Sequence, residues 1–126
     1  MGNAEFRVLC HCLGLSAHAV ATLGHVQERT VRHWWSTGQP PDDVWHAVCA
    51  IDQTFARMVA DAVQKHAGST GTVTLLACRD ERTWWRAQPM FEGLPIQAHS
   101  ALLQRMRDAL THAGHQVAIT YGGDEQ

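Results

Sequence analysis

The chain has 126 residues, 45% of them hydrophobic and 17% charged, and its formal net charge is −2. These values are typical of one globular domain, or of one small domain with an appendage, and exclude a largely disordered chain. No apolar run is long enough to cross a bilayer, and the N-terminus lacks the basic start and apolar middle of a signal peptide. We therefore expect a soluble, cytoplasmic protein with no membrane partner.

Residues 1–40 predict a cluster of short helices, because apolar residues recur there at helical spacing between capping residues and glycines. The predicted ends are Asn3 and Gly14 for the first helix, Ser16 and Gly24 for the second, and Gln27 and Gly38 for the third. In the third helix, Val31 and Trp34 lie one turn apart and should face inward. The N-terminal part is thus expected to be a compact bundle of four or five helices, once the helix that follows is counted.

Residues 41–68 predict one long connecting helix that opens with a proline–aspartate start signal. Apolar residues recur at steps of four and three from Val44 to Ala62, which gives a continuous stripe along about 25 residues. We expect this stripe to pack on the N-terminal cluster and on the C-terminal part. A coiled-coil dimer seam is the alternative, although the stripe covers fewer than three heptads.

Residues 69–126 predict a β-α-α-β unit. The segments 72–77 and 115–121 are rich in β-branched residues and should be strands. Asp80 is suited to cap a short helix between them, and Pro95 to begin a longer one. A crossover of this length makes the two strands parallel. The predicted fold class is therefore mainly α with a small α/β tail.

The predicted sheet is too small to stand alone, because two short strands are marginally stable and leave their edges open. Pairing with a second copy of the chain is the simplest remedy, so we expect a homodimer formed by the α/β unit. Its interface is predicted from the strands and the aromatic residues of this unit. These residues are Val73, Leu75, Trp84, Trp85, Phe91, Val117, Ile119 and Tyr121.

Residues 16–36 predict a helix-turn-helix. The apolar residues before Gly24, followed by Val26, Val31 and Trp34, supply the inward positions that this motif needs. The outer arc of the second helix then carries hydrogen-bonding side chains. These are Gln27, Glu28, Arg29, Arg32, His33 and Ser36. Such an arc suits the major groove, where arginine pairs with guanine and glutamine with adenine. The free backbone N–H groups at Ser16 would suit a phosphate.

The stretch LGLSAHAVATLGHVQERTVRHWWSTGQPPDDV resembles the cro/repressor-type (XRE-like) helix-turn-helix family, through the residues RTVRHW at 29–34 and the later glycine and prolines. The layout after it resembles the YdiL-like branch of that family, which includes regulators associated with anti-CRISPR operons. The resemblance implies a dimeric repressor that binds an inverted-repeat operator in double-stranded DNA and is autoregulatory and phage or mobile-element associated. His25 and Thr37 are inserted relative to the family pattern, and Trp35 replaces an acidic residue.

Two observations favour a different interpretation of residues 27–36. Glu28 and Arg32 are four residues apart, so they could pair on an ordinary solvated helix face. Residues 1–38 contain three arginines and two glutamates, a balance of only +1, whereas phosphate contacts supply most DNA affinity. A dimer on two half-sites about 34 Å apart would offset this. The alternative hypothesis is a protein-interaction module, antitoxin-like or a host-takeover protein, that keeps the helix-turn-helix shape without contacting bases.

No catalytic set is evident, since the sequence lacks a nucleophile elbow and a glycine-rich phosphate loop. We therefore expect that the chain is not an enzyme and that it binds no cofactor and no small-molecule ligand. The best case for a metal is Cys10-His11-Cys12, but residues two apart diverge on a helix and no second ligand pair completes a tetrahedral site. A zinc-dependent structural protein is the third hypothesis.

Overall fold

The computed structural model describes residues 2–122, which form six α-helices, one short 3-10 helix and two strands. The elements are α1 (Asn3–Cys12), α2 (Ala17–Gly24), α3 (Glu28–Ser36), α4 (Asp42–Lys65), β1 (Thr72–Ala77), α5 (Glu81–Ala87), η1 (Pro89–Phe91), α6 (Ile96–His112) and β2 (Gln116–Tyr121). The strands pair in parallel. A mainly helical fold with a small parallel sheet near the C-terminus confirms the predicted class at this level.

Two of the predicted helix caps, Ser16 and Asp80, are present. The Ser16 Oγ accepts a hydrogen bond from the N–H of Ala19 at 3.2 Å, and the Asp80 carboxylate accepts one from the N–H of Thr83 at 2.8 Å. Asn3, by contrast, is the first residue of α1, and its side-chain amide donates to the carbonyl of Ser36 instead. The predicted capping role of Asn3 is wrong because its side chain joins α1 to α3.

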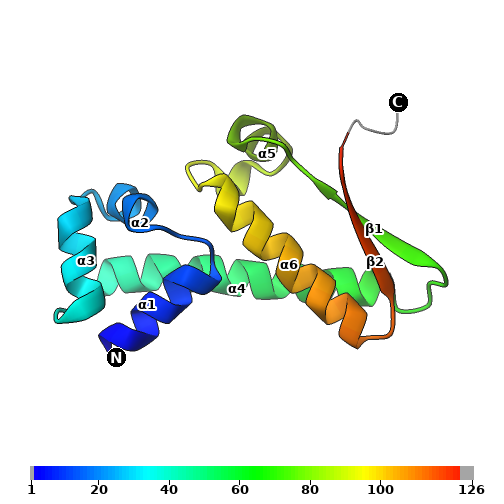
Figure 1. The fold of residues 1–126 in the computed structure, drawn as a ribbon, viewed down its shortest axis with the longest axis horizontal. Coiled ribbons are helices and arrows are strands. Elements are labelled where there is room, and N and C mark those ends of the chain that lie inside the picture. The colour runs from blue at the N-terminus through cyan, green and yellow to red at the C-terminus, as the bar shows by residue number, and fades with distance from the viewer. Residues whose placement is uncertain (1, 123–126) are drawn as a thin grey trace.

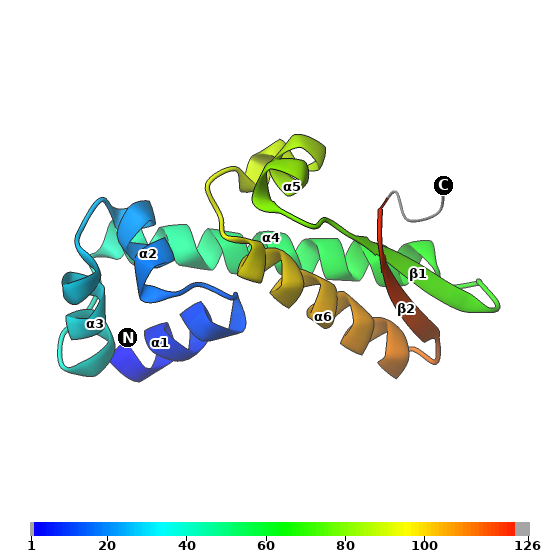
Figure 2. The ribbon, with the colours of Figure 1, turned by 45° about the horizontal axis from the view of Figure 1, so that its top comes forward.

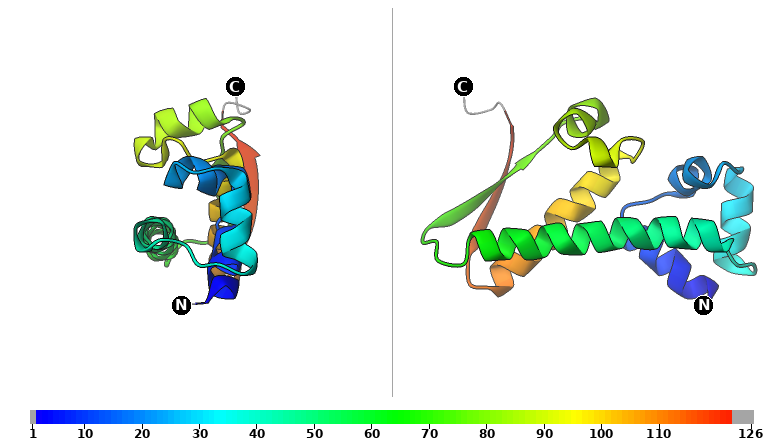
Figure 3. Two further views of the ribbon diagram at one scale, coloured as in Figure 1. Left: turned by 90° about the vertical axis from the view of Figure 1, so that its left-hand side faces the viewer. Right: turned by 180° about the vertical axis from the view of Figure 1, so that it is seen from behind.

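Helix α4 runs along most of the length of the molecule (Figure 1). The three N-terminal helices gather around its first half, whereas α6 and the two strands lie toward its other end (Figures 1 and 3). Turning the molecule shows α1 and α6 on the same side of this helix (Figure 2). None of the helices in residues 2–122 is both long enough and apolar enough to cross a membrane by itself.

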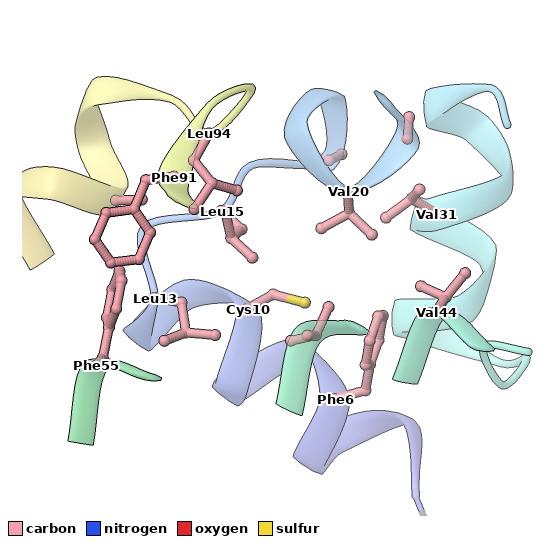
Figure 4. Close-up of a cluster of buried hydrophobic side chains, with 14 of the residues drawn as sticks. Phe6, Cys10, Leu13, Leu15, Val20, Val31, Val44, Phe55, Phe91 and Leu94 are labelled. Atoms are coloured by element: carbon pink, nitrogen blue, oxygen red, sulfur yellow. The ribbon is translucent and has the colours of Figure 1, made fainter. Parts of the chain in front are cut away.

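One continuous cluster of buried apolar side chains connects the N-terminal helices with α4, α5, η1 and the first part of α6 (Figure 4). Its members come from the N-terminal helices (Phe6, Val20, Val31), from α4 (Val44, Val48, Phe55) and from the C-terminal part (Trp84, Phe91, Leu102). The segments predicted at 1–40, 41–68 and 69–126 each contribute side chains to this cluster.

The turn between α1 and α2 lies directly on the first turn of α6. Gly14 has a φ of +73°, and an ideal Cβ added to it would lie 2.3 Å from the carbonyl oxygen of Gln97. Real Cβ atoms do not approach a backbone oxygen so closely. Glycine at this position thus allows the N-terminal helices and α6 to meet backbone to backbone.

The strand register decides which residues face α6. Val73 pairs with Val117, Leu75 with Ile119 and Ala77 with Tyr121, and alternate residues of a strand point to the same face. Val73 is buried, so this is the face that α6 covers. Leu75 and Val117 are half-buried, and Ile119 and Tyr121 are exposed.

Three of the predicted dimer contacts are already covered by their own chain. Val73, Trp84 and Phe91 are each at most 3% exposed, and the Trp84 ring stacks on Phe91 with the centroids 5.1 Å apart. Trp85 is half-buried and its indole Nε1 donates to the carbonyl of Leu94. In this structure, Val73, Trp84 and Phe91 offer almost no surface to a second copy.

His99 joins α6 to the end of β1. Its Nε2 accepts a hydrogen bond from the backbone N–H of Cys78 at 2.9 Å, and the residue is only 5% exposed. An Nε2 atom that accepts this bond carries no proton, so the ring is neutral. Burial lowers the pKa of His99 below its ordinary value of 6.5.

We expect His99 to lower the free energy of unfolding as the pH drops below about 6.5. At these pH values the imidazole binds a proton in the unfolded chain but stays neutral in the folded one. The contribution of His99 to the free energy of unfolding is fully present above the pKa of His99 in the unfolded chain. It declines with falling pH until the lower pKa of His99 in the folded chain is reached. The slope from this group is at most about 1.4 kcal/mol per pH unit. Urea unfolding from pH 7.5 to 5 measures it. His99→Gln should flatten the curve, and an unchanged pH dependence in that variant would contradict the assignment.

Candidate nucleic-acid interface

Helices α2 and α3 are joined by the three-residue turn at 25–27. Its first residue, His25, has a φ of 56°, the left-handed region that glycine usually occupies at the end of a helix. The predicted stop at Gly24 is one residue early, because Gly24 is still helical. An ideal Cβ on Gly24 would lie 3.1 Å from a methyl carbon of Val44, so this glycine serves the close approach of α2 to α4.

Two of the three predicted inward residues, Val31 and Trp34, anchor the inner side of α3, whereas the third, Val26 in the preceding turn, is 36% exposed. Val31 is fully buried and Trp34 is 6% exposed, and both belong to the core shared with α2 and α4. The Trp34 ring meets Phe6 of α1 edge to face, with the centroids 6.5 Å apart. Figure 4 shows Val31 pointing toward Val20 of α2 and Val44 of α4. These contacts fix the rotation of α3 about its own axis.

The residues predicted to contact DNA lie on the outer side of α3 or next to it. Arg29, Arg32, His33 and Ser36 are exposed on the helix, and Gln27 is exposed at its N-cap. Glu28 is half-buried. Ser16 is exposed as well, at the N-cap of α2. The structure therefore brings the six predicted residues of 27–36 onto one helix, with Ser16 at the start of the neighbouring helix.

Glu28 connects the two helices electrostatically. One carboxylate oxygen lies 3.0 Å from Nδ1 of His18 on α2, and the other accepts from the Arg32 guanidinium at 3.0 Å. The pair between Glu28 and Arg32 is the one that the sequence spacing allows. The Arg32 and Glu28 side chains are 63% and 41% exposed, so the ion pair contributes little stability. Its geometric effect is to hold the Arg32 guanidinium near the N-terminal turn of α3.

The C-terminal end of α3 is organised differently. The Nδ1 atom of His33 lies 3.2 Å from the Thr37 hydroxyl, and an ideal Cβ on Gly38 would meet the His33 ring at 2.8 Å. The ring thus lies against the turn that follows α3. Ser36 donates its hydroxyl hydrogen to the carbonyl of His33 at 3.4 Å. Both residues lie in the last turn of α3.

Trp35 packs against α1. The guanidinium carbon of Arg7 lies 5.9 Å from the centre of its ring, and the His11 ring meets it edge to face at 5.0 Å. This residue therefore covers the edge of the helical cluster. No local sequence pattern signals the contacts of Trp35 with α1, because they join residues far apart in the chain. The same holds for the hydrogen bond from Asn3 to Ser36 and for the pairing of His18 with Glu28.

The residues described, 2–122, contain no group of three histidine, cysteine, aspartate or glutamate side chains close enough to hold a metal ion. In the Cys10-His11-Cys12 run, Cys10 is buried while its two neighbours are exposed. Burial raises the pKa of the Cys10 thiol to about 11. A thiol of that kind is a packing residue and a poor metal ligand at neutral pH.

Comparison of the whole chain with protein-family models, with curated proteins and with solved structures found no match.

Proposed function

We propose that this chain is a dimeric, sequence-specific DNA-binding protein that represses transcription, with α2 and α3 as its helix-turn-helix. One observation carries the proposal. Val31 and Trp34 bury the inner side of α3, and the opposite side presents Arg29 and Arg32 beside the exposed N-terminus of α2. Helices anchored in this way enter the major groove with their N-terminal residues at the base edges.

Dimerisation through the strands is the second part of the proposal. In residues 2–122, β1 and β2 pair only with each other, so both outer edges of the sheet are open. Next to these edges, Leu76 is 56% exposed, Tyr121 is 43% exposed and Ile119 is 36% exposed. A second copy placed here would cover the edges and supply a second recognition helix for an inverted repeat. Autoregulation and a phage or mobile-element source are part of the same hypothesis.

Arg29→Ala and Arg32→Ala are each expected to cost about 1–3 kcal/mol on the correct operator and to relax specificity at one base pair. The reason is that each guanidinium can pair with both acceptors of one guanine. A mobility-shift titration against a set of operator variants measures both effects. Thr30→Ala, a change on the same helix without loss of charge, is the control. Equal losses on all sequences would mark the arginines as phosphate contacts.

The alternative function is a protein-interaction module, and the Glu28 network favours it. Glu28 already occupies the Arg32 guanidinium and balances its charge. A mobility-shift or footprinting assay on the DNA upstream of the chain's own gene separates the two functions. A protected inverted repeat at moderate salt supports the repressor. A pure, folded protein with no sequence preference there would leave the interaction module as the better hypothesis.

A further inference from the structure

The short helix α5 carries an arginine pair on its outer crest. Arg82 and Arg86 are four residues apart and both are exposed. Trp84 is two residues from each arginine, which corresponds to about 200° of helical rotation, so it lies on the opposite side of the helix. Its side chain is fully buried. The buried tryptophan therefore fixes the direction in which the two guanidinium groups point, which is away from the core.

The acidic residues beside this crest are already engaged by backbone groups. The Asp80 carboxylate accepts from the N–H of Thr83 at 2.8 Å, and the Glu81 carboxylate accepts from the N–H of Ile96 at 2.9 Å. Hydrogen bonds from Thr83 lower the pKa of Asp80, and the two arginines add a smaller lowering effect. Within residues 2–122, neither Arg82 nor Arg86 forms a hydrogen bond or an ion pair. Their donors are available to an external anion.

Helix α5 lies beside α2, one of the proposed DNA-binding helices, and its arginine crest lies about 100° round the helix from the residues that face α2. A groove of about 340 Å³ separates α2 from α5 and is lined by Ser16, His18 and Thr22 on one side and by Glu81 and Trp85 on the other. Figures 1 and 2 show α2 and α5 on the same side of α4. Ser16 is the predicted phosphate contact, so α5 continues the surface that begins there.

The N-terminal segment carries little positive charge for a DNA-binding surface. Residues 1–38 contain Arg7, Arg29 and Arg32 against Glu5 and Glu28, a balance of +1. Backbone phosphates supply a large part of protein–DNA affinity, and each contact needs a cationic or N–H donor. The recognition helix alone offers few such donors. Exposed arginines on a neighbouring rigid helix are the type of group that binds phosphates without selecting bases.

We propose that Arg82 and Arg86 contact the phosphate backbone of duplex DNA that flanks each half-site, next to the N-terminus of α2. This inference rests on the proposed DNA-binding function and adds to it a second, sequence-independent surface outside the helix-turn-helix. The pair supplies affinity, whereas Arg29 and Arg32 supply sequence preference. A dimer would carry four such arginines.

The test is the salt dependence of DNA binding by the full chain and its Arg82→Gln/Arg86→Gln variant. The probes are a duplex with the chain's upstream inverted repeat and an unrelated duplex of equal length. We expect affinity for both duplexes to fall by a similar factor of about ten or more at low salt. The plot of log affinity against log salt should become shallower by about 3 to 4, since four phosphate contacts are lost per dimer. Arg107→Gln, which removes an exposed charge near the far end of α6, should change neither value.

The possible outcomes separate this inference from the proposed function. Specific binding by the wild type with an unchanged salt slope in the double variant would overturn the α5 contact and leave the repressor intact. Equal wild-type affinity for the two duplexes would overturn the repressor, and a shallower slope in the variant would still support the α5 contact. A loss confined to the inverted-repeat duplex would also contradict a backbone role. A thermal unfolding curve unchanged from that of the wild type confirms that the double variant is folded.

Discussion

Replacing Gly14 with alanine is expected to destabilise the fold by about 3 kcal/mol or more. A left-handed backbone costs a non-glycine residue about 1–2 kcal/mol, and overpacking adds about 1–3 kcal/mol. Here the new methyl group would lie 2.3 Å from the carbonyl oxygen of Gln97 and 2.8 Å from the backbone nitrogen of Ala98. Backbone atoms at the start of a helix cannot turn away as a flexible side chain can. The α1–α2 turn and α6 would have to separate.

Gly114→Ala is the matched control for this prediction. Gly114 also has a positive φ, +100°, but an ideal Cβ there has no atom within 4 Å. Gly114→Ala should therefore lower the free energy of unfolding only by the cost of the left-handed backbone, about 1–2 kcal/mol. Urea unfolding of the two variants gives the comparison. Equal losses would show that the contact between the α1–α2 turn and α6 does not stabilise the protein.

Ile119→Lys is expected to convert the proposed dimer into a monomer and to weaken operator binding by about 10² to 10⁴-fold. Two linked recognition helices gain about this factor because the second binds at a high effective concentration. Ile119 is 36% exposed on the edge strand β2, where a lysine would bring a charge into a strand–strand contact. Size-exclusion chromatography with light scattering gives the oligomeric state, and a mobility shift gives the affinity.

Met90→Lys serves as the control for dimer loss. Met90 is 68% exposed in η1, away from the strands, so the same change of an apolar residue to lysine should leave the dimer intact. A dimer that persists in Ile119→Lys would place the interface elsewhere. The apolar groove between α1, α4 and α6, with Val8 61% exposed at its edge, would then be the next surface to test.

Local sequence signals predicted the elements well, because each depends on residues close together in the chain. Ser16 and Asp80 cap helices through the N–H three residues ahead, and the β-branched strands flank a crossover that leaves only a parallel pairing. His25 shows the limit of such signals. Its left-handed backbone replaces the expected glycine stop, since Gly24 is needed where α2 meets α4. Tertiary packing overrides the local preference there.

The candidate site was predictable in its composition and less so in its orientation. The spacing of Val31 and Trp34 correctly gives the inner side of α3. It does not tell that the His33 ring folds against Thr37, or that Glu28 reaches across to His18. Likewise, Trp84 and Phe91 are apolar residues in a predicted interface unit, yet they complete the core of their own chain. Long-range contacts decide these points, and a single sequence does not contain them as a pattern.

The 24 residues of α4 act as a spacer in the proposed dimer. At about 1.5 Å per residue the helix is about 36 Å long, with α3 at one end and the strands toward the other (Figure 3). Two protomers joined end to end at their strands would hold their recognition helices up to about 72 Å apart. That distance equals about two turns of B-DNA, whereas the sequence suggested half-sites one turn apart. An operator with about 20 base pairs between the centres of its half-sites would match this architecture, and the length of α4 would then set which inverted repeats the protein can span.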